Sequence, residues 1–236
     1  MLLGLPMRVR NYGADADIVS DGDSPHECCL VLTGFVCRYK MLGDGRRQIL
    51  SFHTPGDMPD LQSLYLDVMD HSLGTLVETT AAFIEHGAIR GIMRKHPGIA
   101  EAFSRDMLVD AAIFREWMTG LGRRDARERI AHLLCEMFLR SRAVGLARET
   151  GFSFPVTQAD IGDALGLSTV HVNRVLQELR RDGLVRGNFS NLAILDWPGL
   201  LAAGDFDPTY LHQRPETAGG IGAVGRALEG AAHPAH

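Results

Sequence analysis

The chain has 236 residues, of which 45% are hydrophobic and 22% are charged, the composition of a soluble globular protein long enough for two modest domains. No apolar run approaches the roughly 18 residues that a membrane span requires, and the first residues lack the long apolar core of a signal peptide. These features exclude the membrane and secreted classes, so we expect a cytoplasmic protein. The net charge of −5 argues against polyanionic partners unless positive charge is gathered locally.

Positive charge is concentrated in residues 123–195, which contain 11 lysines and arginines but only eight acidic residues. The segments on either side, residues 1–122 and 196–236, are both net acidic. Because local charge rather than the total sets the attraction to phosphate, residues 123–195 are the candidate for contact with a polyanion.

Residues 8–90 are predicted to be strand-like, because they consist of short apolar runs separated by turn residues. The turns are marked by Gly34, by Gly43-Asp44-Gly45 and by Pro55-Gly56-Asp57. Strands are predicted at 29–32, 35–40, 48–52, 73–78 and 82–85. Many short strands at this spacing predict a sandwich or a roll, which we assign to residues 1–96.

Pro97 begins a long helical segment with a repeating apolar seam. The seam advances in steps of three and four residues, as in a coiled coil, through Phe103, Met107, Ala111, Phe114, Met118 and Leu121. Most lone amphipathic helices pack on their own domain. This one is long, lies between two candidate domains and carries large apolar residues, so we interpret 97–122 as a dimerisation helix.

Gly120-Leu121-Gly122 is predicted to interrupt this helix and to act as a hinge. A second helix is predicted over 123–142, with Ile130, Leu133, Leu134 and Met137 facing inward. The domain that begins at 123 is predicted to end at 197. Residues 198–236 form a C-terminal extension, predicted to be disordered from about residue 214 because it is rich in Gly, Ala and Pro.

Residues 157–195 carry the most specific pattern in the chain. Thr157 and Asp160 have the spacing of a capping box, Gly166 suits a tight turn, and Ser168 suits the first position of a second helix that stops at Gly183. A small β-hairpin follows. This order predicts a winged helix-turn-helix, whose second helix enters the DNA major groove. The alternative is an ordinary helical hairpin with a solvated outer face.

The outer face of the second helix has side chains that suit base edges. Val172, Val175, Leu176 and Leu179 form the inward stripe, whereas Val170, Asn173, Arg174 and Gln177 form the opposite face, with Thr169 beside them. Arg pairs with guanine, and Asn or Gln pairs with adenine. The pattern therefore favours sequence-specific binding of double-stranded DNA.

The order of roll, long helix, hinge and winged helix resembles the Crp/Fnr superfamily of bacterial transcription regulators. The resemblance covers about residues 8–197, and its most specific pieces are VLTGFVCRYK, the PGD at 55–57, LGRRDARERIAHLL and TQADIGDALGLSTVHVNRVLQELRRDGLV. It implies an α+β protein with an N-terminal double-stranded, jelly-roll-like β-roll, a homodimer along the long helix, and a C-terminal winged helix-turn-helix. Operator DNA and RNA polymerase are the implied partners.

The resemblance also implies roles for single residues. The guanine-reading arginine of the family matches Arg174, and the other base-reading positions fall on Thr169, Val170 and Asn173. Relatives often carry Glu where Val170 stands, so the half-site is expected to differ, with a thymine methyl facing Val170. DNA-backbone contacts are expected from Thr157 and Ser168 at the helix starts, from His171, and from Arg186 and Asn188 near the wing tip.

The effector site of the family is not reproduced. Members that bind cyclic AMP carry a Gly-Glu pair shortly after PGD and an Arg-Ser pair about ten residues later, where this chain has Asp60-Leu61 and His71-Ser72. The phosphate-binding arginine is replaced, and Asp60 is expected to repel a phosphate. We therefore expect no cyclic AMP binding of the usual kind and assign no cofactor.

The remaining candidate sites favour structural roles. Cys28, Cys29, Cys37 and Cys135 do not have the spacing of zinc or iron–sulfur ligands and are expected to be buried thiols. His53, His71, His86 and His96 form no pair at ligand spacing, and no catalytic motif is present, so we expect neither a metal site nor an enzyme.

The leading hypothesis is a homodimeric regulator that binds a palindromic operator. The alternative is a sensor of a small molecule or haem whose main output is not DNA binding.

Overall fold

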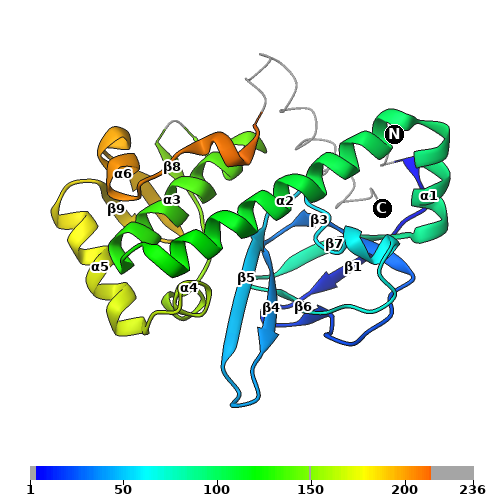
Figure 1. Ribbon diagram of the computed structural model, residues 1–236, viewed down its shortest axis with the longest axis horizontal. Helices are drawn as coiled ribbons and strands as arrows, with labels where there is room; N and C mark the ends of the chain where they lie inside the picture. The colour runs from blue at the N-terminus through cyan, green and yellow to red at the C-terminus, as the bar shows by residue number, and fades with distance from the viewer. Residues whose placement is uncertain (1–3, 149, 214–236) are drawn as a thin grey trace, which may run out of the picture. The chain divides into compact units, whose positions relative to one another are not determined.

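The computed structural model describes residues 4–148 and 150–213 (Figure 1). Their contacts divide the chain into two compact units. Among the described residues, the first unit contains 4–40 together with 50–111, and the second contains 41–49 together with 112–148 and 150–213. The boundary at 111/112 lies inside a helix, so this helix belongs to both units.

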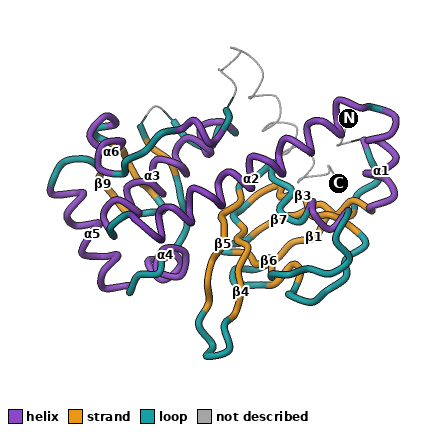
Figure 2. The backbone as a smooth tube through the Cα atoms, viewed as in Figure 1, coloured by secondary structure: helices purple, strands orange, loops and turns teal. Residues whose placement is uncertain are grey.

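Two antiparallel sheets build the N-terminal half (Figure 2). One sheet has the order β1-β7-β3 and contains β1 (Arg8–Tyr12), β3 (Glu27–Thr33) and β7 (Thr79–Glu85). The other has the order β2-β6-β4-β5 and contains β2 (Asp17–Val19), β4 (Val36–Met41), β5 (Arg47–His53) and β6 (Ser72–Thr75). The roll predicted from the strand spacing is confirmed.

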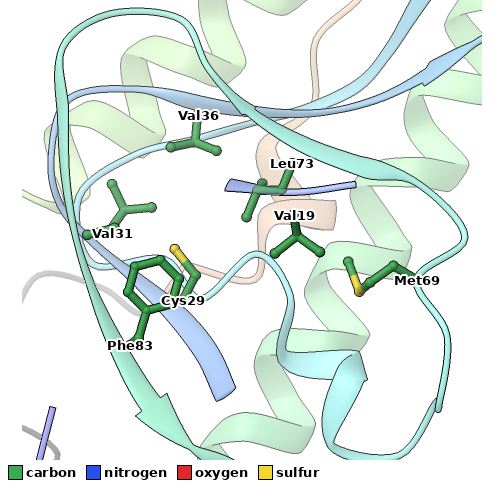
Figure 3. Close-up of a cluster of buried hydrophobic side chains, with 8 residues drawn as sticks. Val19, Cys29, Val31, Val36, Met69, Leu73 and Phe83 are labelled. Atoms are coloured by element: carbon green, nitrogen blue, oxygen red, sulfur yellow. The ribbon is translucent and has the colours of Figure 1, made fainter. Parts of the chain in front are cut away.

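The strand β3 lies at the edge of its sheet and is nevertheless buried on both faces. Cys29 pairs with Phe83 and Val31 with Ala81, and these side chains share one apolar cluster with Val19, Val36, Met69 and Leu73 (Figure 3). Successive side chains of a strand point to opposite faces, so Cys28 packs in a different cluster, against residues of the helices. The two adjacent cysteines therefore lie on opposite faces of β3.

A 3₁₀ helix, η2 (Leu61–Leu64), and two helices accompany the strands. α1 (His86–Lys95) follows β7 directly, and α2 (Pro97–Arg123) begins at the predicted proline. Residues 86–90 were expected to be strand-like, and this was wrong. Ile89 and Ile92 of α1 are buried whereas its other face is exposed, a spacing of three that suits a helix.

α2 is continuous through the glycine-containing segment 120–122, so the predicted interruption of the helix was wrong. A glycine inside a helix costs only about 1 kcal/mol relative to alanine. The buried side chains of Ala112, Ile113 and Trp117 anchor the last turns of α2. The helix ends at Arg123, and Asp125 then caps the next helix with a complete capping box.

The second unit contains a three-helix bundle, a small sheet and a C-terminal segment. Its main helices are α3 (Ala126–Ala143), α4 (Gln158–Leu165) and α5 (Thr169–Arg181), and α3 packs against both others. The sheet has the order β8-β10-β9 and contains β8 (Gly151–Phe152), β9 (Val185–Asn188) and β10 (Asn191–Ile194). α6 (Trp197–Ala203) and η3 (Pro208–Leu211) follow. The predicted disorder from residue 214 lies outside the described residues.

Candidate nucleic-acid interface

The start of α4 is fixed by the predicted capping box. The Thr157 hydroxyl accepts a hydrogen bond from the Asp160 backbone N–H (3.1 Å), and the Asp160 carboxylate accepts one from the Thr157 backbone N–H (2.8 Å). Two amide groups that would otherwise lack a partner at the helix start are thereby satisfied. Thr157 remains exposed, as its expected contact with the DNA backbone requires.

The turn between α4 and α5 is closed by two glycines. Gly166 has φ +65°, which places it in the left-handed region where a side chain is disfavoured. The Leu167 N–H donates a hydrogen bond to the Gly162 carbonyl oxygen (3.0 Å). This brings the Leu167 carbonyl oxygen so close that a Cβ atom at Gly162 would lie only 2.5 Å from it. A side chain at Gly162 would collide with the Leu167 carbonyl oxygen, and one at Gly166 would strain the backbone.

α5 has one apolar face and one polar face, as predicted. Ser168 caps it by accepting a hydrogen bond from the His171 N–H (3.2 Å). The inward stripe is buried and comprises Val172, Val175, Leu176 and Leu179. The predicted base-reading residues lie together on the exposed face, namely Thr169, Val170, Asn173 and Arg174.

Two features of this exposed face bear on base recognition. Val170 is 81% exposed, the highest value among the large apolar side chains of the described residues. The Arg174 guanidinium is 66% exposed and has only a loose ion pair with Glu178, at 4.0 Å. Since surface ion pairs contribute at most about 1 kcal/mol, Arg174 can leave Glu178 at low cost.

The structure adds Arg181 to this face, seven residues after Arg174 and likewise exposed. It was missed although the seven-residue spacing places both arginines on the same side of a helix. Gln177, between them, is also exposed.

The wing is formed by β9 and β10, with Asn191 paired to Asn188 across the turn. Asn188 is exposed, and its side-chain oxygen accepts a hydrogen bond from the Asn191 N–H (3.0 Å). The turn therefore lies at Phe189-Ser190, directly after the residues 186–188 that were predicted as the wing tip. Arg186 is exposed but stands on β9 and not at the tip, because Gly187, with φ +93°, continues the strand pair and does not end it.

The apolar seam predicted for α2 is divided between a buried part and an exposed part. Phe103 is buried against η2 and α1 of its own chain, and Met107 packs against the same cluster. Ala111 and Phe114 are half-buried, whereas Met118 is 73% exposed and Leu121 is also exposed. Leu108, which was not predicted, is 69% exposed. At the N-terminal end of the predicted seam, the exposed apolar residue is therefore Leu108, one position after Met107.

The four residues proposed for an effector pocket each have contacts within the roll. Asp60 is fully buried, and both of its carboxylate oxygens accept from the Cys29 N–H, at 2.8 and 2.9 Å. Burial raises the pKa of Asp60 to about 7, against the lowering effect of these hydrogen bonds. Leu61 is part of the apolar cluster around Phe103. Asp60 is thus a structural residue directed at β3, and the repulsion of phosphate attributed to it has no basis in its position.

His71 and Ser72 also have partners within the roll. His71 Nδ1 lies 2.7 Å from the Asp70 carboxylate, and the Ser72 hydroxyl accepts from the Asp21 N–H (3.0 Å). Burial lowers the pKa of His71, and the positive charge of Arg38 lowers it further, whereas Asp70 raises it.

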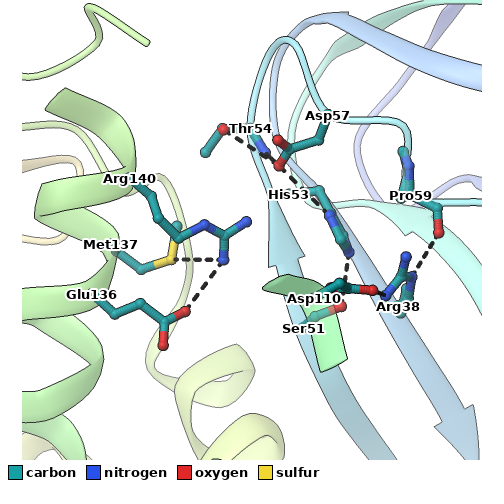
Figure 4. A network of polar contacts seen from close by, with 10 residues as sticks. All are labelled: Arg38, Ser51, His53, Thr54, Asp57, Pro59, Asp110, Glu136, Met137 and Arg140. Atoms are coloured by element: carbon teal, nitrogen blue, oxygen red, sulfur yellow. Dashed lines mark hydrogen bonds and ion pairs between the residues drawn. The ribbon is translucent and has the colours of Figure 1, made fainter. Parts of the chain in front are cut away.

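Arg38 is a buried arginine on β4 that crosses from the roll to α2 (Figure 4). Its Nε donates to the Pro59 carbonyl oxygen (2.6 Å), and its guanidinium pairs with Asp110 of α2. His53 and Ser51 are hydrogen-bonded beside it (2.8 Å). The chain's own side chains thus supply a charged network in the interior of the roll.

The thiols lie in the interior of the protein. All four cysteines are buried, as predicted, and form no disulfide bond, and burial raises the pKa of Cys28 and of Cys135 to about 12. Within residues 4–148 and 150–213, no three His, Cys, Asp or Glu residues are grouped to hold a metal ion. In the same residues, no helix is long and apolar enough to cross a membrane.

Two families match the two halves of the chain. Residues 9–96 match the cyclic nucleotide-binding domain, and residues 128–203 match the Crp-like helix-turn-helix domain. Together the matches cover the roll and the unit that carries the exposed face of α5.

Relatives and solved structures agree with these matches. The chain is 30% identical over 182 residues to the transcriptional activator protein FnrL of Cereibacter sphaeroides, covering 75% of this chain and 71% of FnrL. It is 31% identical to the nitrogen fixation regulation protein FixK of Rhizobium meliloti, covering 76% and 79%. The structure of FixK2 from Bradyrhizobium japonicum superposes with a TM-score of 0.77 at 26% identity, covering 84% of this chain and 98% of FixK2. The chain belongs to the Crp/Fnr family of transcription regulators.

Proposed function

We propose that this protein is a homodimeric, sequence-specific regulator that binds a palindromic operator in the cytoplasm and acts on RNA polymerase. The exposed face of α5 is the observation that carries the proposal. Thr169, Val170, Asn173 and Arg174 present two hydroxyl or amide groups, one methyl surface and one guanidinium along one side of a helix. These groups match the donor, acceptor and methyl pattern of the major groove.

The exposed stripe on α2 supports the homodimer. Leu108, Met118 and Leu121 are large apolar side chains on the surface of one helix. A second copy of the chain would bury them as a parallel helix pair. A symmetric dimer presents two α5 helices to successive major-groove faces, which explains why a palindrome is the expected target.

The polar network within the roll supports regulation without cyclic AMP. Arg38 already pairs with Asp110 of α2, and neutral His71 stands where the family's cyclic AMP-binding members have a phosphate-binding arginine. A neutral imidazole supplies one donor, whereas an arginine supplies a charged fork that matches phosphate.

Selection from a pool of random DNA duplexes tests the proposal. The full-length protein should enrich a two-fold symmetric site without added nucleotide, and footprinting should show two protected half-sites about one helical turn apart. An absorbance scan of the purified protein identifies a haem or other chromophore. Failure to enrich any duplex, together with a bound chromophore, would favour the sensor alternative.

A further inference from the structure

A fully buried carboxylate lies in the middle of α3. Glu136 Oε2 accepts hydrogen bonds from the indole N–H of Trp117 on α2 (3.0 Å) and from the hydroxyl of Tyr210 on η3 (2.8 Å). Its other oxygen pairs with Arg140, one turn later on α3 (3.2 Å, Figure 4). One side chain thereby joins the last part of α2, the centre of α3 and the C-terminal segment.

His132, one turn before Glu136, holds the same C-terminal segment. Its Nδ1 lies 3.1 Å from the Gly204 carbonyl oxygen, and its Nε2 lies 3.1 Å from the Tyr210 hydroxyl. The imidazole and phenol rings are stacked, with centroids 5.8 Å apart and planes inclined by 15°. Burial and the charge of Glu136 raise the pKa of Tyr210, so its hydroxyl retains the proton that it donates.

The backbone of the C-terminal segment packs directly against the backbone of α3. A Cβ atom at Gly204 would lie 2.6 Å from the His132 backbone nitrogen, so only glycine permits this contact. Phe206 adds an edge-to-face contact with the His132 ring, at 4.8 Å between centroids. Residues 204–211, which we call the C-terminal clasp, therefore pack on α3 through Gly204, Phe206 and Tyr210.

A buried polar network of this kind contributes more to the relative orientation of the elements that it joins than to the free energy of unfolding. Removing a carboxylate from water is costly, and a buried ion pair is often no more stable than well-packed apolar residues of similar size. Hydrogen bonds, in contrast, fix both the distance and the angle between the groups that they join. Three donors on one carboxylate fix the positions of the elements that carry them.

We propose that Tyr210 and Glu136 are positioning residues, and that the C-terminal clasp sets the angle between the end of α2 and α3. α3 packs against α4 and α5, so this angle also sets the direction of the recognition helix relative to α2. The proposal rests on the proposed function, in which α2 pairs with a second copy. It assigns a role in DNA binding to residues that lie outside the helix-turn-helix and cannot reach a base.

The consequence concerns the distance between half-sites. In a dimer, the angle between α2 and α3 determines how far apart the two recognition helices lie. Each added base pair moves a half-site along the DNA and rotates it about the axis, so a fixed angle accepts one spacing and rejects its neighbours. A protein without the clasp should still read the half-sites but should discriminate less between spacings.

The test compares full-length wild type with Tyr210→Phe, which removes one hydroxyl and leaves the ring contacts. Affinity is measured for the selected operator and for operators with one base pair added to or removed from the centre. We expect Tyr210→Phe to reduce the discrimination between spacings by about three- to tenfold, the order of magnitude that one buried hydrogen bond contributes. Tyr65→Phe is the matched control, because Tyr65 is exposed on the roll, and it should leave the discrimination unchanged.

Trp117→Phe removes the donor on the α2 side and should give the same relaxed spacing. Thermal unfolding of each variant measures stability separately, and emission of Trp117 in a Trp197→Phe background reports its environment without DNA. Equal loss of affinity at all spacings would overturn the proposal and leave a structural role only. Absence of operator binding by the wild type would instead contradict the proposed function.

Discussion

Val170 is the residue on α5 that departs most clearly from a polar DNA-reading face. Val170 is 81% exposed in the folded chain, so its side chain is available for a contact made in a complex. The thymine methyl group is the apolar feature of the major groove. Val170 therefore predicts a methyl-dependent half-site.

Replacing the contacted thymine by deoxyuridine should weaken binding about fourfold per half-site, because burial of one methyl-sized group contributes about 0.8 kcal/mol. The wild type is titrated with operators substituted at one thymine at a time. The variant Val170→Ala should lose most of this sensitivity. Equal affinity for every thymine and deoxyuridine operator would contradict a methyl contact.

Arg174→Ala should abolish specific binding while the dimer stays folded. Arg174 is exposed and only loosely paired, so its removal leaves no buried group without a partner. Loss of one bidentate base contact costs about 1–3 kcal/mol per half-site, and a dimer loses it twice. Gel-shift titration against operator and random duplex measures the effect. Arg8→Ala, similarly exposed on the roll, is the control, and an Arg174→Ala protein as tight as wild type would refute the assignment.

Asp60 makes the stability of the roll depend on pH. Its pKa is raised to about 7 in the folded protein, whereas a carboxyl group in an unfolded chain titrates near 4. Between about pH 4 and 7, Asp60 is therefore protonated in the folded state but ionised in the unfolded chain. The free energy of unfolding falls progressively over this range and no longer changes from this cause above about pH 7. The slope is at most about 1.4 kcal/mol per pH unit.

Urea unfolding of wild type and Asp60→Asn at pH 5.5 and pH 8 isolates this effect, because the other titrating groups are common to both chains. The free energy of unfolding of the wild type, relative to the variant, should be greater at pH 5.5. Asp67→Asn, which changes an exposed carboxylate, should show no such difference between the two pH values. A difference between wild type and Asp60→Asn that does not vary with pH would contradict the buried, proton-retaining carboxyl.

At the scale of the element, α2 is the helix on which dimerisation depends. We expect Leu108→Glu and Met118→Glu each to give a monomer, because a dimer would have to bury an unpaired carboxylate. Both side chains are exposed in the single chain, so neither change disturbs its own core. Sedimentation at micromolar concentration measures the mass, and Glu101→Gln, at an exposed position near the start of α2, is a control. A dimeric Met118→Glu protein would exclude the C-terminal half of α2 from the interface.

The sequence predicts those parts of the elements that depend on local chemistry. The capping box of Thr157, the turn at Gly166 and the cap at Ser168 all occur as predicted, because each involves only neighbouring residues. The apolar and polar faces of α5 follow from its period.

The predictions were wrong where contacts between residues that are distant in sequence determine the structure. Periodicity shows that Phe103 is on an apolar face, but only the roll that packs beside it determines that this face is covered within the chain. Asp60 has the sequence position of an effector ligand, but its hydrogen bond to Cys29 lies 31 residues away in sequence. The clasp contacts of Glu136 likewise join residues from α2 and η3 that no local pattern connects.

At the scale of the whole molecule, the roll and the DNA-binding unit are expected to act together without cyclic AMP. Calorimetry at neutral pH should show no micromolar binding of cyclic AMP, because the neutral His71 offers no positive charge to a phosphate. The operator affinity should be the same with and without the nucleotide. A cyclic AMP-binding member of the family, measured in the same buffer, is the positive control. Micromolar binding, or operator binding that requires cyclic AMP, would contradict this reading of the roll.

The boundary between the two units lies inside α2, between residues 111 and 112, and this constrains how the gene can recombine. Exchange of the roll for that of a relative must splice within a helix. Each inserted or deleted residue rotates everything that follows by about 100°. Exchanges that add seven residues nearly restore the original phase. Chimaeras should therefore remain functional when the length of the joint differs by multiples of seven residues, which is about two helical turns. They should lose function at the intermediate lengths.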